Sequence, residues 1–579
     1  MKNIIVIAII LVLFASCKKS SFLDDKSNNA LTEQTVFTDS VRTMAFLTRI
    51  YEDEGFAFVK TRWENGGQEQ ATDDSEFNLL NTARRPLILY TSSYNADSFP
   101  FFDFWQVPWD NIRRTNLLIS KLPTTPLKPA TQKRVAAEAR FLRAWFYYNL
   151  LINFGGIPII NDKVYTADEE INVPRSTFEE SVSYLVKELD NAAAELPVEF
   201  RDNDHGRVTK GAAMAVKSRL LLYAASPLFN GNAFPNPTSA QRSALAGYPT
   251  YSVARWQAAA DAALAVINSG TYSLNLENNV SPGFGFYNVF LKRVNTEYIF
   301  FYNRIPNRDW EQFYLPVSRG NGSRNGTPTQ TLVDAFPMKS GKAITDPTSG
   351  YNPQNPYTDR DPRFYYSIIY NGAPYFSRST NTKIPVFTYV GAPTDGFTQS
   401  TAAAGPSGYF SRKMLDENLS ADGPGTTVRG WGIIRYAEIL LNYAEAINET
   451  GQTALAYPAL RLIRERAGIS SSNDFGMKPN MSQEEMRQFV RNERHIELMY
   501  ESTRWDDARR WKIATTVFNG FNKLMRPTKV DVSAQYPTGY RYEIINSLFL
   551  HTFNERNYLL PIPASEIRRA PAMLQNPGW

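Results

Sequence analysis

The 579 residues of the chain contain one cysteine, Cys17, so no disulfide can form within it. A chain without internal cross-links must be held together by its buried apolar core and its polar contacts. The hydrophobic content of 43% is that of a folded globular protein with ample core. The sequence therefore predicts a large fold that is stabilised without covalent links.

The position of Cys17 also predicts how the N-terminus is processed. Lys2 precedes an apolar run of 11 residues, 4–14, and the small residues Ala15 and Ser16 lie directly before Cys17. This pattern is typical of a signal peptide, residues 1–16, that is cleaved before a lipid-modified cysteine. Residues 17–29 then form a lipid-anchored tether. The alternative is an ordinary secretory signal with an incidental cysteine.

Charge and apolar patterning narrow the classes of protein further. There are 62 basic and 57 acidic residues and no basic block, so nucleic acid is not an expected partner. After the signal, no apolar run approaches the 20 residues that a membrane-spanning helix needs. Aromatic residues make up 13% of the chain. They suit either sugar stacking or a large core, and for most of them we expect the core.

Apolar residues recur at helical spacing in two blocks of the chain. In residues 135–150 they are spaced by four, three, four and four, which predicts a long helix that ends at Gly155. We expect further helices over residues 210–225 and 256–268. In the second block, residues 434–450 and 456–467 make a helix pair with the period of a tetratricopeptide-like repeat, and its second helix starts near Tyr457.

A capping box formed by Ser482 and Glu485 begins another helix, which we expect to run toward Arg504.

Helical periodicity disappears between the two blocks, from residue 272 to 430. Gly, Pro, Asn, Thr and aromatic residues dominate there, with short strands expected at 298–302 and 364–370. The predicted fold is mostly α, an α-solenoid of tetratricopeptide-like helix pairs with this loop-rich insertion. Residues 30–271 form its N-terminal helical part and residues 272–579 its C-terminal part, of which 431–579 are helical.

Residue patterns for catalysis or metal binding are nearly absent. The three histidines lie far apart, and no zinc, phosphate-loop, dinucleotide or nucleophile-elbow motif occurs. The motif from Asp202 to Gly206 lacks the later glutamate of a calcium loop. The pair Asp73-Asp74 has the residue type that glycosidases use, but adjacency gives no such geometry, and we expect a helix cap or solvent exposure.

The densest charge pattern lies at residues 493–506. Its carboxylates and arginines suit either an active site or a partly buried ion-pair network, and we favour the network. We expect Arg494 and Arg504 to pair with carboxylates near them on one helix.

An ordered set of motifs across nearly the whole mature chain resembles the SusD/RagB family, the surface lipoproteins of starch-utilisation-type uptake systems. Each motif is weak by itself, whereas their order is highly specific. The motifs lie at residues 22–24, 105–116, 138–158, 207–225, 361–364, 435–446, 463–468, 493–511, 558–563 and 575–579.

The resemblance implies a function without catalysis. Such proteins have four tetratricopeptide-like helix pairs and a variable loop-rich face, need no cofactor, and bind an oligosaccharide or another nutrient. They cap a SusC-like TonB-dependent outer-membrane channel, so the expected location is the outer membrane, lipid-anchored and facing outward. One departure affects the outward orientation, because Lys18-Lys19 follow the cysteine where acidic residues are usual.

The resemblance also suggests where ligand binds, although no motif matches residue by residue. The family's site maps to residues 84–102 and 302–314, and the signature motifs are assigned to the scaffold. The candidate ligand contacts are Arg84, Tyr90, Tyr94, Asn95, Trp310 and Tyr314.

Two other classes stay open: a surface glycoside hydrolase, and a helical-repeat scaffold that binds only protein. The hydrolase needs two convergent carboxylates in a cleft. The scaffold needs a concave helical groove without aromatic platforms.

Overall fold

The computed structural model describes residues 32–58, 67–77, 85–166, 168–231, 234, 240–322, 326–398, 407–420, 422–423, 425, 428 and 430–579. Cys17, the predicted signal peptide and tether, and Arg84 lie outside the described residues. No helix in the described ranges is both long and apolar enough to cross a membrane.

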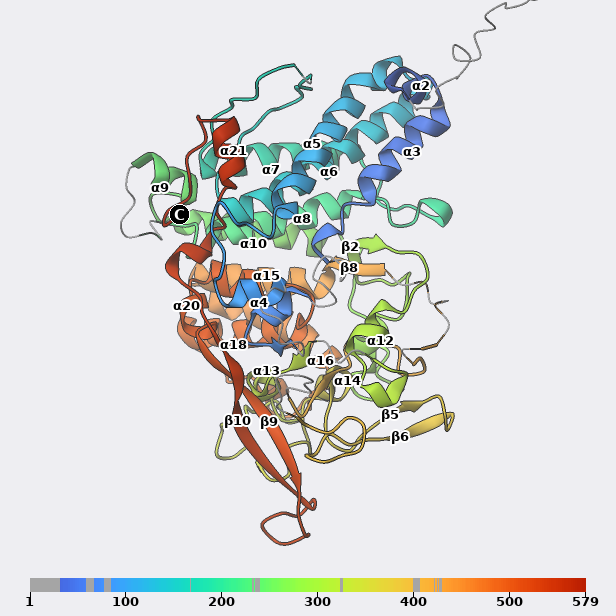
Figure 1. The fold of residues 1–579 in the computed structure, drawn as a ribbon, viewed down its shortest axis with the longest axis vertical. Helices are drawn as coiled ribbons and strands as arrows, with labels where there is room; N and C mark the ends of the chain where they lie inside the picture. The colour runs from blue at the N-terminus through green and yellow to red at the C-terminus, as the bar shows by residue number, and fades with distance from the viewer. Residues whose placement is uncertain are drawn as a thin grey trace, which may run out of the picture.

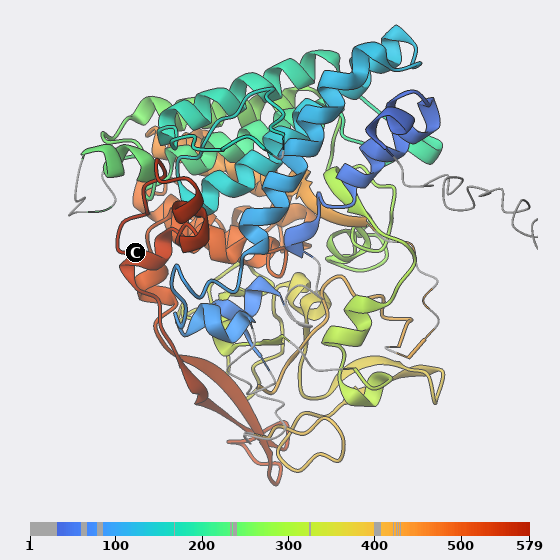
Figure 2. The same ribbon diagram turned by 45° about the horizontal axis from the view of Figure 1, so that its top comes forward.

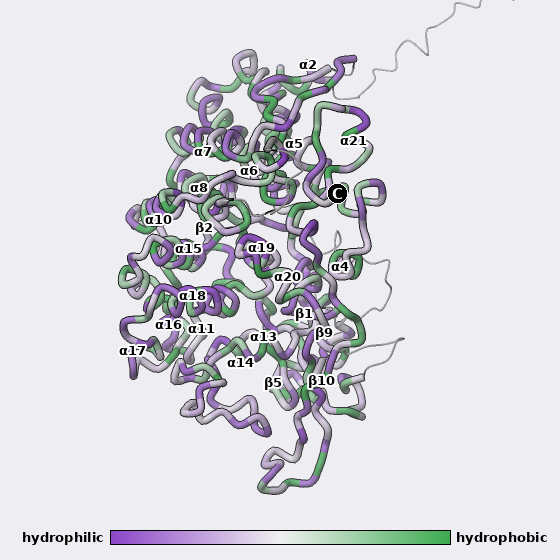
Figure 3. Tube along the Cα trace, turned by 90° about the vertical axis from the view of Figure 1, so that its left-hand side faces the viewer, coloured by the Kyte–Doolittle hydropathy of each residue, from purple (hydrophilic) through white to green (hydrophobic). Residues whose placement is uncertain are grey.

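A stack of helices forms one side of the molecule (Figure 1). Each of α5, α6, α7, α8, α10, α15 and α18 contacts the next in this order, and α16 packs on α15. Figure 3 shows α7, α8, α10, α15 and α18 following one another down the molecule. Their bounds are Asp103–Lys121 (α5), Pro129–Phe154 (α6), Phe178–Glu195 (α7), Lys210–Ala225 (α8), Val253–Asn268 (α10), Tyr436–Glu449 (α15), Tyr457–Arg466 (α16) and Gln483–Glu497 (α18).

The contact between α10 and α15 joins the two helical blocks, although residues 269–435 separate these helices in sequence. The predicted α-solenoid is therefore confirmed, with the loop-rich segment inserted between two neighbouring helices.

Local signals place most helix ends. Thr177, Thr209 and Ser482 accept a hydrogen bond from a backbone N–H in the first turn of the helix that follows each of them. Helix α6 ends at Gly155, as predicted, and Gly155 has a φ of 75°, which glycine adopts readily. The predicted limits of α8 and the start of α16 at Tyr457 agree with the structure.

Two local predictions are wrong. The helix expected to run toward Arg504 ends at Glu497, and a new helix, α19 (Arg504–Arg510), follows Tyr500 and Ser502, whose φ angles of 60° and 59° break the helix. Most of the strand expected at residues 364–370 is α14 (Pro362–Ser367), because the preceding Asp361 caps a helix that has proline in its first turn. Only β4 (Ile368–Ile369) is a strand there.

The insertion contains short antiparallel strand pairs. In this region β2 (Tyr298–Asn303) pairs with β8 (Gly430–Arg435), β4 with β7 (Phe410–Ser411), and β5 (Ala373–Ser377) with β6 (Thr382–Val386). A further short pair links β1 (Ser75–Glu76) to β3 (Thr327–Pro328). The other α-helices among the described residues are α2 (Glu33–Phe37), α3 (Ser40–Tyr51), α4 (Arg85–Tyr90), α9 (Ala240–Ala246), α11 (Phe284–Asn288), α12 (Asp309–Tyr314), α13 (Gln330–Ala335), α17 (Asn473–Gly476), α20 (Ala514–Val517) and α21 (Ala564–Arg569).

A long β-hairpin lies in the C-terminal part, where the sequence predicted helices. Strands β9 (Gly520–Lys529) and β10 (Tyr540–His551) pair antiparallel with Tyr540 opposite Lys529. The hairpin projects from the lower end of the molecule in both ribbon views (Figures 1 and 2). Along much of β10, exposed residues alternate with less exposed ones, a period of two that separates it from the helices.

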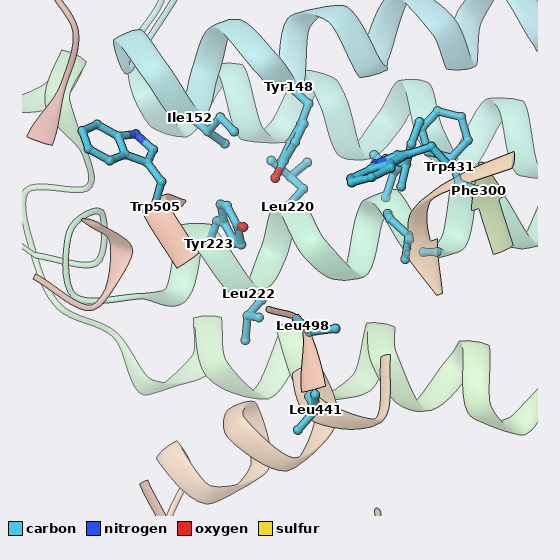
Figure 4. Close-up of a cluster of buried hydrophobic side chains, with 14 of the residues drawn as sticks. Tyr148, Ile152, Leu220, Leu222, Tyr223, Phe300, Trp431, Leu441, Leu498 and Trp505 are labelled. Atoms are coloured by element: carbon cyan, nitrogen blue, oxygen red, sulfur yellow. The ribbon is translucent and has the colours of Figure 1, made fainter. Parts of the chain in front are cut away.

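Aromatic and aliphatic side chains join the helix stack to the insertion. Figure 4 shows Tyr148 of α6, Tyr223 of α8, Phe300 of β2 and Trp431 of β8 in one buried cluster. The rings of Trp145 and Phe300 meet edge to face with centroids 5.0 Å apart. The insertion is thus packed onto the scaffold by a shared core.

Candidate functional site

Two of the predicted ligand-binding rings, Tyr90 and Tyr94, are buried and packed against protein. Tyr90 stacks on His551 with ring centroids 4.0 Å apart. Tyr94 stacks on Trp579 at 5.3 Å, and its hydroxyl accepts a hydrogen bond of 2.8 Å from Asn557. Burial raises the pKa of Tyr94 to about 12. Both rings are packed in the core, Tyr90 at the end of α4 and Tyr94 in the segment that follows it.

The other two predicted rings, Trp310 and Tyr314, lie on α12 and are also buried. Trp310 is stacked on Trp431 at 4.4 Å and lies parallel to Tyr314 at 5.8 Å. The Tyr314 hydroxyl donates to Glu69. Beside Trp310 there is a void of only about 10 Å³, which is too small for a sugar ring.

Asn95 is the one exposed residue among the predicted contacts that the structure describes. Its side-chain oxygen accepts hydrogen bonds from the backbone N–H groups of Asp97 and Ser98, each 2.9 Å long. Asn95 therefore shapes a turn. Tyr90 and Tyr94 are thus both buried in the core, each with its ring stacked on another ring of the described chain.

A pocket of about 770 Å³ opens instead between α5, the segment after α6, and α21. We name it the α5 pocket. α21 lies beside α5 in the upper half of the molecule (Figure 1). The pocket is lined by Phe102, Trp105, Gln106, Trp109, Asp110, Arg113, Pro158, Ile160, Lys163, Tyr165, Thr166, Glu169, Ile171, Val173, Ser565, Glu566, Arg569, Ala570 and Met573.

One face of α5 supplies the aromatic wall of this pocket. Phe102, Gln106, Trp109 and Arg113 recur at spacings of four, three and four, so they follow one another along a single helix face. Phe102 and Trp109 are half-buried, as is Tyr165 on the opposite side. Their partly open rings offer the flat apolar surface that sugar C–H groups pack against.

Charged side chains around the α5 pocket balance in number. The lining contains three acidic groups, Asp110, Glu169 and Glu566, and three basic groups, Arg113, Lys163 and Arg569. Lys163 pairs with Glu169 at 3.1 Å and Arg569 with Glu566 at 3.4 Å. The pocket therefore offers donors and acceptors without a net charge.

The sequence contained a signal for this pocket, because Trp105 and Trp109 are one helical turn apart. Sequence reasoning assigned the whole motif to the scaffold and missed it. Trp105 does belong to the core, being buried, whereas Trp109 lies at the boundary between core and pocket. The partners on α21 and the segment after α6 are more than 40 residues away in sequence, so only the fold brings them together.

The Asp73-Asp74 pair lies neither at the surface nor at a helix cap, contrary to expectation. Both carboxylates are buried, and Asp73 accepts two hydrogen bonds from Arg504, of 2.8 and 2.7 Å. Asp74 contacts His495. The carboxylates of Asp73 and Asp74 and the imidazole of His495 lie close enough to share a metal ion. The guanidinium of Arg504 already neutralises Asp73 and would repel a cation there, so the geometry fits an ion-pair network better than a metal site.

The charge pattern at residues 493–506 is a buried ion-pair network, as favoured from the sequence. Its partners, however, come from other elements and not from one helix. Arg494 pairs with Asp507 of α19 at 3.2 Å, and Arg504 pairs with Asp73, far away in sequence. Glu497 accepts from Arg363 and Arg435, at 2.9 and 2.7 Å. The network ties the insertion to α18.

Comparisons with known proteins agree with this architecture. A family model described as "SusD family" matches residues 288–579, and one described as "Starch-binding associating with outer membrane" matches residues 21–222. A SusD-like protein of Formosa agariphila is 24% identical over 484 residues, which cover 82% of this chain and 80% of that protein.

Solved structures show the same fold. A SusD-like protein from Bacteroides fragilis superposes with a TM-score of 0.74 at 24% identity, covering 95% of this chain and 99% of that one. A SusD-like carbohydrate binding protein from Bacteroides fragilis gives a TM-score of 0.71 at 23% identity, covering 93% and 99%. The two family models, the relatives and the helix stack together assign the chain to the SusD/RagB family.

Proposed function

We propose that this protein is an outer-membrane lipoprotein that binds an oligosaccharide in the α5 pocket and delivers it to a SusC-like TonB-dependent channel. The match to a family described as starch-binding and associated with the outer membrane carries the proposal. The carbohydrate-binding relative from Bacteroides fragilis adds support. The lipid anchor at Cys17 and the outward orientation are parts of the same proposal.

The α5 pocket suits a neutral sugar for physical reasons. Its volume lies within the range of about 300–1,000 Å³ that small-ligand sites occupy. Partly open rings of Phe102, Trp109 and Tyr165 provide stacking surfaces, and Gln106 is exposed beside them to hydrogen-bond hydroxyls. Because the charges balance, we expect affinity for a neutral glycan to change little with ionic strength.

For the four buried rings Tyr90, Tyr94, Trp310 and Tyr314 we propose a packing role. Each has a ring face or hydroxyl engaged by protein, and stacking a sugar on it requires opening the core. Arg84 lies outside the described residues and Asn95 shapes a turn, so neither adds a direct ligand contact to the proposal.

We propose binding without hydrolysis. The densest carboxylate clusters in the described chain are buried in ion pairs with arginine and are not free for acid–base work. Incubation of the purified protein with any glycan that it binds is expected to release no new reducing ends. Release of reducing ends, abolished by Asp110→Asn or Glu169→Gln, would support the glycosidase alternative.

Binding is tested by calorimetry on malto-, laminari-, xylo- and manno-oligosaccharides. Trp109→Ala is expected to lower the affinity for the bound oligosaccharide at least tenfold, because it removes a stacking ring. A tenfold change in affinity corresponds to about 1.4 kcal/mol. Tyr251→Ala is the matched control, because Tyr251 is a ring that is 63% exposed away from the pocket.

Trp310→Ala separates the two placements of the site. We expect it to lower the melting temperature while the folded variant binds normally, because Trp310 packs in the core. Loss of ligand in Trp310→Ala at an unchanged melting temperature, with normal binding by Trp109→Ala, would place the sugar where the sequence alone put it. Absence of binding to every neutral probe would contradict the neutral-sugar proposal.

Delivery is tested by purifying the tagged, full-length protein from outer membranes. A TonB-dependent channel is expected to co-purify in stoichiometric amount. A protein that binds glycan but is recovered alone under conditions that preserve such complexes would separate capture from delivery.

A further inference from the structure

A second pocket, of about 390 Å³, is lined by residues of α14 and of neighbouring segments. We name it the α14 pocket. Helix α14 lies in the loop-rich half of the molecule (Figure 1). Four cationic side chains, Lys339, Arg360, Lys383 and Arg412, line it, against two carboxylates, Asp359 and Glu417. Its lining therefore carries an excess of two positive charges, whereas the lining of the α5 pocket carries none.

One carboxylate serves two of these cations. Glu417 pairs with Lys383 at 2.9 Å and also accepts from Nη2 of Arg412. Although burial acts to raise the pKa of Glu417, Arg412 and Lys383 hold it below its ordinary value. Nε of Arg412 has no hydrogen-bond partner among the described residues. This pair of cations is therefore only partly neutralised by protein.

The other two cations have no carboxylate at ion-pair distance in the part of the chain that the structure describes. Lys339 is exposed, and neither an ion pair nor a side-chain hydrogen bond holds its ammonium group. Arg360 is fully buried, and its guanidinium donates to the carbonyls of Val333, Phe336 and Pro356 at 2.6, 2.8 and 2.9 Å. The carbonyls fix Arg360 in place but leave its full charge beneath the pocket floor.

Two tyrosines give the same pocket an aromatic side. Tyr366 stacks on Tyr287 at 5.0 Å, and the guanidinium carbon of Arg412 lies 5.7 Å from the Tyr366 ring centroid. Tyr365 is half-buried, and its hydroxyl donates to the carbonyl of Tyr357 at 2.7 Å. Rings and cations thus meet at one opening.

We propose that the α14 pocket binds the anionic substituent of an acidic glycan, either the carboxylate of a uronic acid or a sulfate ester. Lysine and arginine make charge-assisted hydrogen bonds to such oxyanions, and the tyrosine rings accommodate the sugar that carries them. This inference rests on the proposed glycan-binding function and adds a ligand class to it. The charge-neutral α5 pocket and the cationic α14 pocket then select different chemical groups.

The test compares three probes of matched length by calorimetry: an oligogalacturonate, a sulfated carrageenan oligosaccharide and a neutral oligosaccharide. The double variant Lys339→Gln/Lys383→Gln is expected to bind the acidic probe about tenfold more weakly, since it loses two partly exposed charge contacts. Both lysines are exposed, so folding is expected to be unchanged. Lys187→Gln, an exposed lysine on α7, is the control and is expected to bind like the natural protein.

Each outcome decides the inference. Binding of the oligogalacturonate alone assigns a carboxylate, binding of the carrageenan oligosaccharide alone assigns a sulfate ester, and binding of both assigns oxyanions generally. In each case affinity must fall as salt rises from 50 to about 300 mM. Equal affinity in the double variant, or no acidic probe bound, overturns the inference. If the neutral probe still binds and depends on Trp109, the proposed function survives that failure; if no probe binds, both fail.

Discussion

Arg435 shows how single buried charges hold two parts of this molecule together. It lies where β8 meets α15, and it donates to Glu297, Glu497 and Glu501 at 2.7 Å each. All of these groups are buried, so they rely on one another in place of water. Removing Arg435 takes one cation away from all three buried carboxylates at once, which is a large effect for one residue.

Arg435→Ala is therefore expected to reduce the free energy of unfolding by about 3–5 kcal/mol. Urea denaturation of the purified protein, followed by tryptophan fluorescence, measures the change. Arg201→Ala is the control, because Arg201 is 78% exposed and its ion pair with Glu199 lies at the surface. It is expected to stay within about 0.5 kcal/mol of the natural protein. Similar losses in both variants would mean that the network contributes nothing specific.

The same network predicts how stability depends on pH. Burial alone raises the pKa of Glu497, but Arg466, Arg435 and Arg363 outweigh it and hold the pKa well below its usual range. The pKa of Glu493 is likewise lowered, because Arg363 and Arg464 outweigh burial. For a carboxyl with a depressed folded-state pKa, the stabilisation is present above its unfolded pKa, near 4.3, and is lost as the pH falls toward the folded value.

We expect the melting temperature to fall as the pH is lowered from about 5 to 3, and to fall less steeply in Glu497→Gln. Scanning calorimetry across this range measures both slopes. Since the glutamine variant loses its charge at every pH, it should start from a lower melting temperature. Parallel curves for the two proteins would show that Glu497 does not contribute to acid unfolding.

At the scale of single elements, two helices of the stack, α6 and α10, end at or next to a glycine with positive φ. Gly155 ends α6 with φ of 75°, and an added Cβ would lie 2.5 Å from the carbonyl oxygen of Leu245. Gly270 follows α10 with φ of 64°, but an added Cβ would meet nothing within 4 Å. Both positions need a left-handed backbone, while only Gly155 also lies against another segment.

Gly155→Ala is expected to destabilise the protein by about 3 kcal/mol or more, and Gly270→Ala by about 1 kcal/mol. Both variants place a side chain at positive φ, and only Gly155→Ala adds a clash with the carbonyl of Leu245, so its loss should be the larger. Thermal unfolding of the two variants under identical conditions provides the comparison. Equal losses would indicate that the segment at Leu245 moves aside without cost.

At the scale of the whole molecule, the helix stack supports a loop-rich half (Figures 1 and 2). The α5 pocket is lined in part by residues of the stack, and the α14 pocket by residues of the loop-rich half. The proposed outer-membrane location rests on the lipid that is proposed at Cys17. Two or more acyl chains anchor a protein stably, because each buried CH₂ contributes about 0.8 kcal/mol.

Cys17→Ala is expected to abolish acyl labelling and to release the protein from the membrane fraction of a Gram-negative host. Metabolic labelling with a radioactive fatty acid, followed by fractionation, measures both effects. Ser20→Ala, three residues further on, is the control and should stay labelled and membrane-bound. Unchanged labelling and membrane association in Cys17→Ala would rule out Cys17 as the site of the lipid.

The sequence by itself determined the parts of this protein that depend on local physics. Apolar spacing and end signals predicted α6, α8, α10 and the α15–α16 pair, because a helix face and its caps lie within a few residues of one another. The ordered motifs indicated the family, and the family model confirms it.

Tertiary structure alone decided which side chains are open to a ligand. The sequence does not show whether an aromatic residue such as Tyr94 or Trp310 faces solvent or core. In the structure Trp579 stacks on Tyr94, and Trp431 stacks on Trp310. The α5 pocket needs α21 and the segment after α6 beside Trp109, and Arg504 meets Asp73 across most of the chain. Such pairings depend on long-range packing, which no local pattern of residues records.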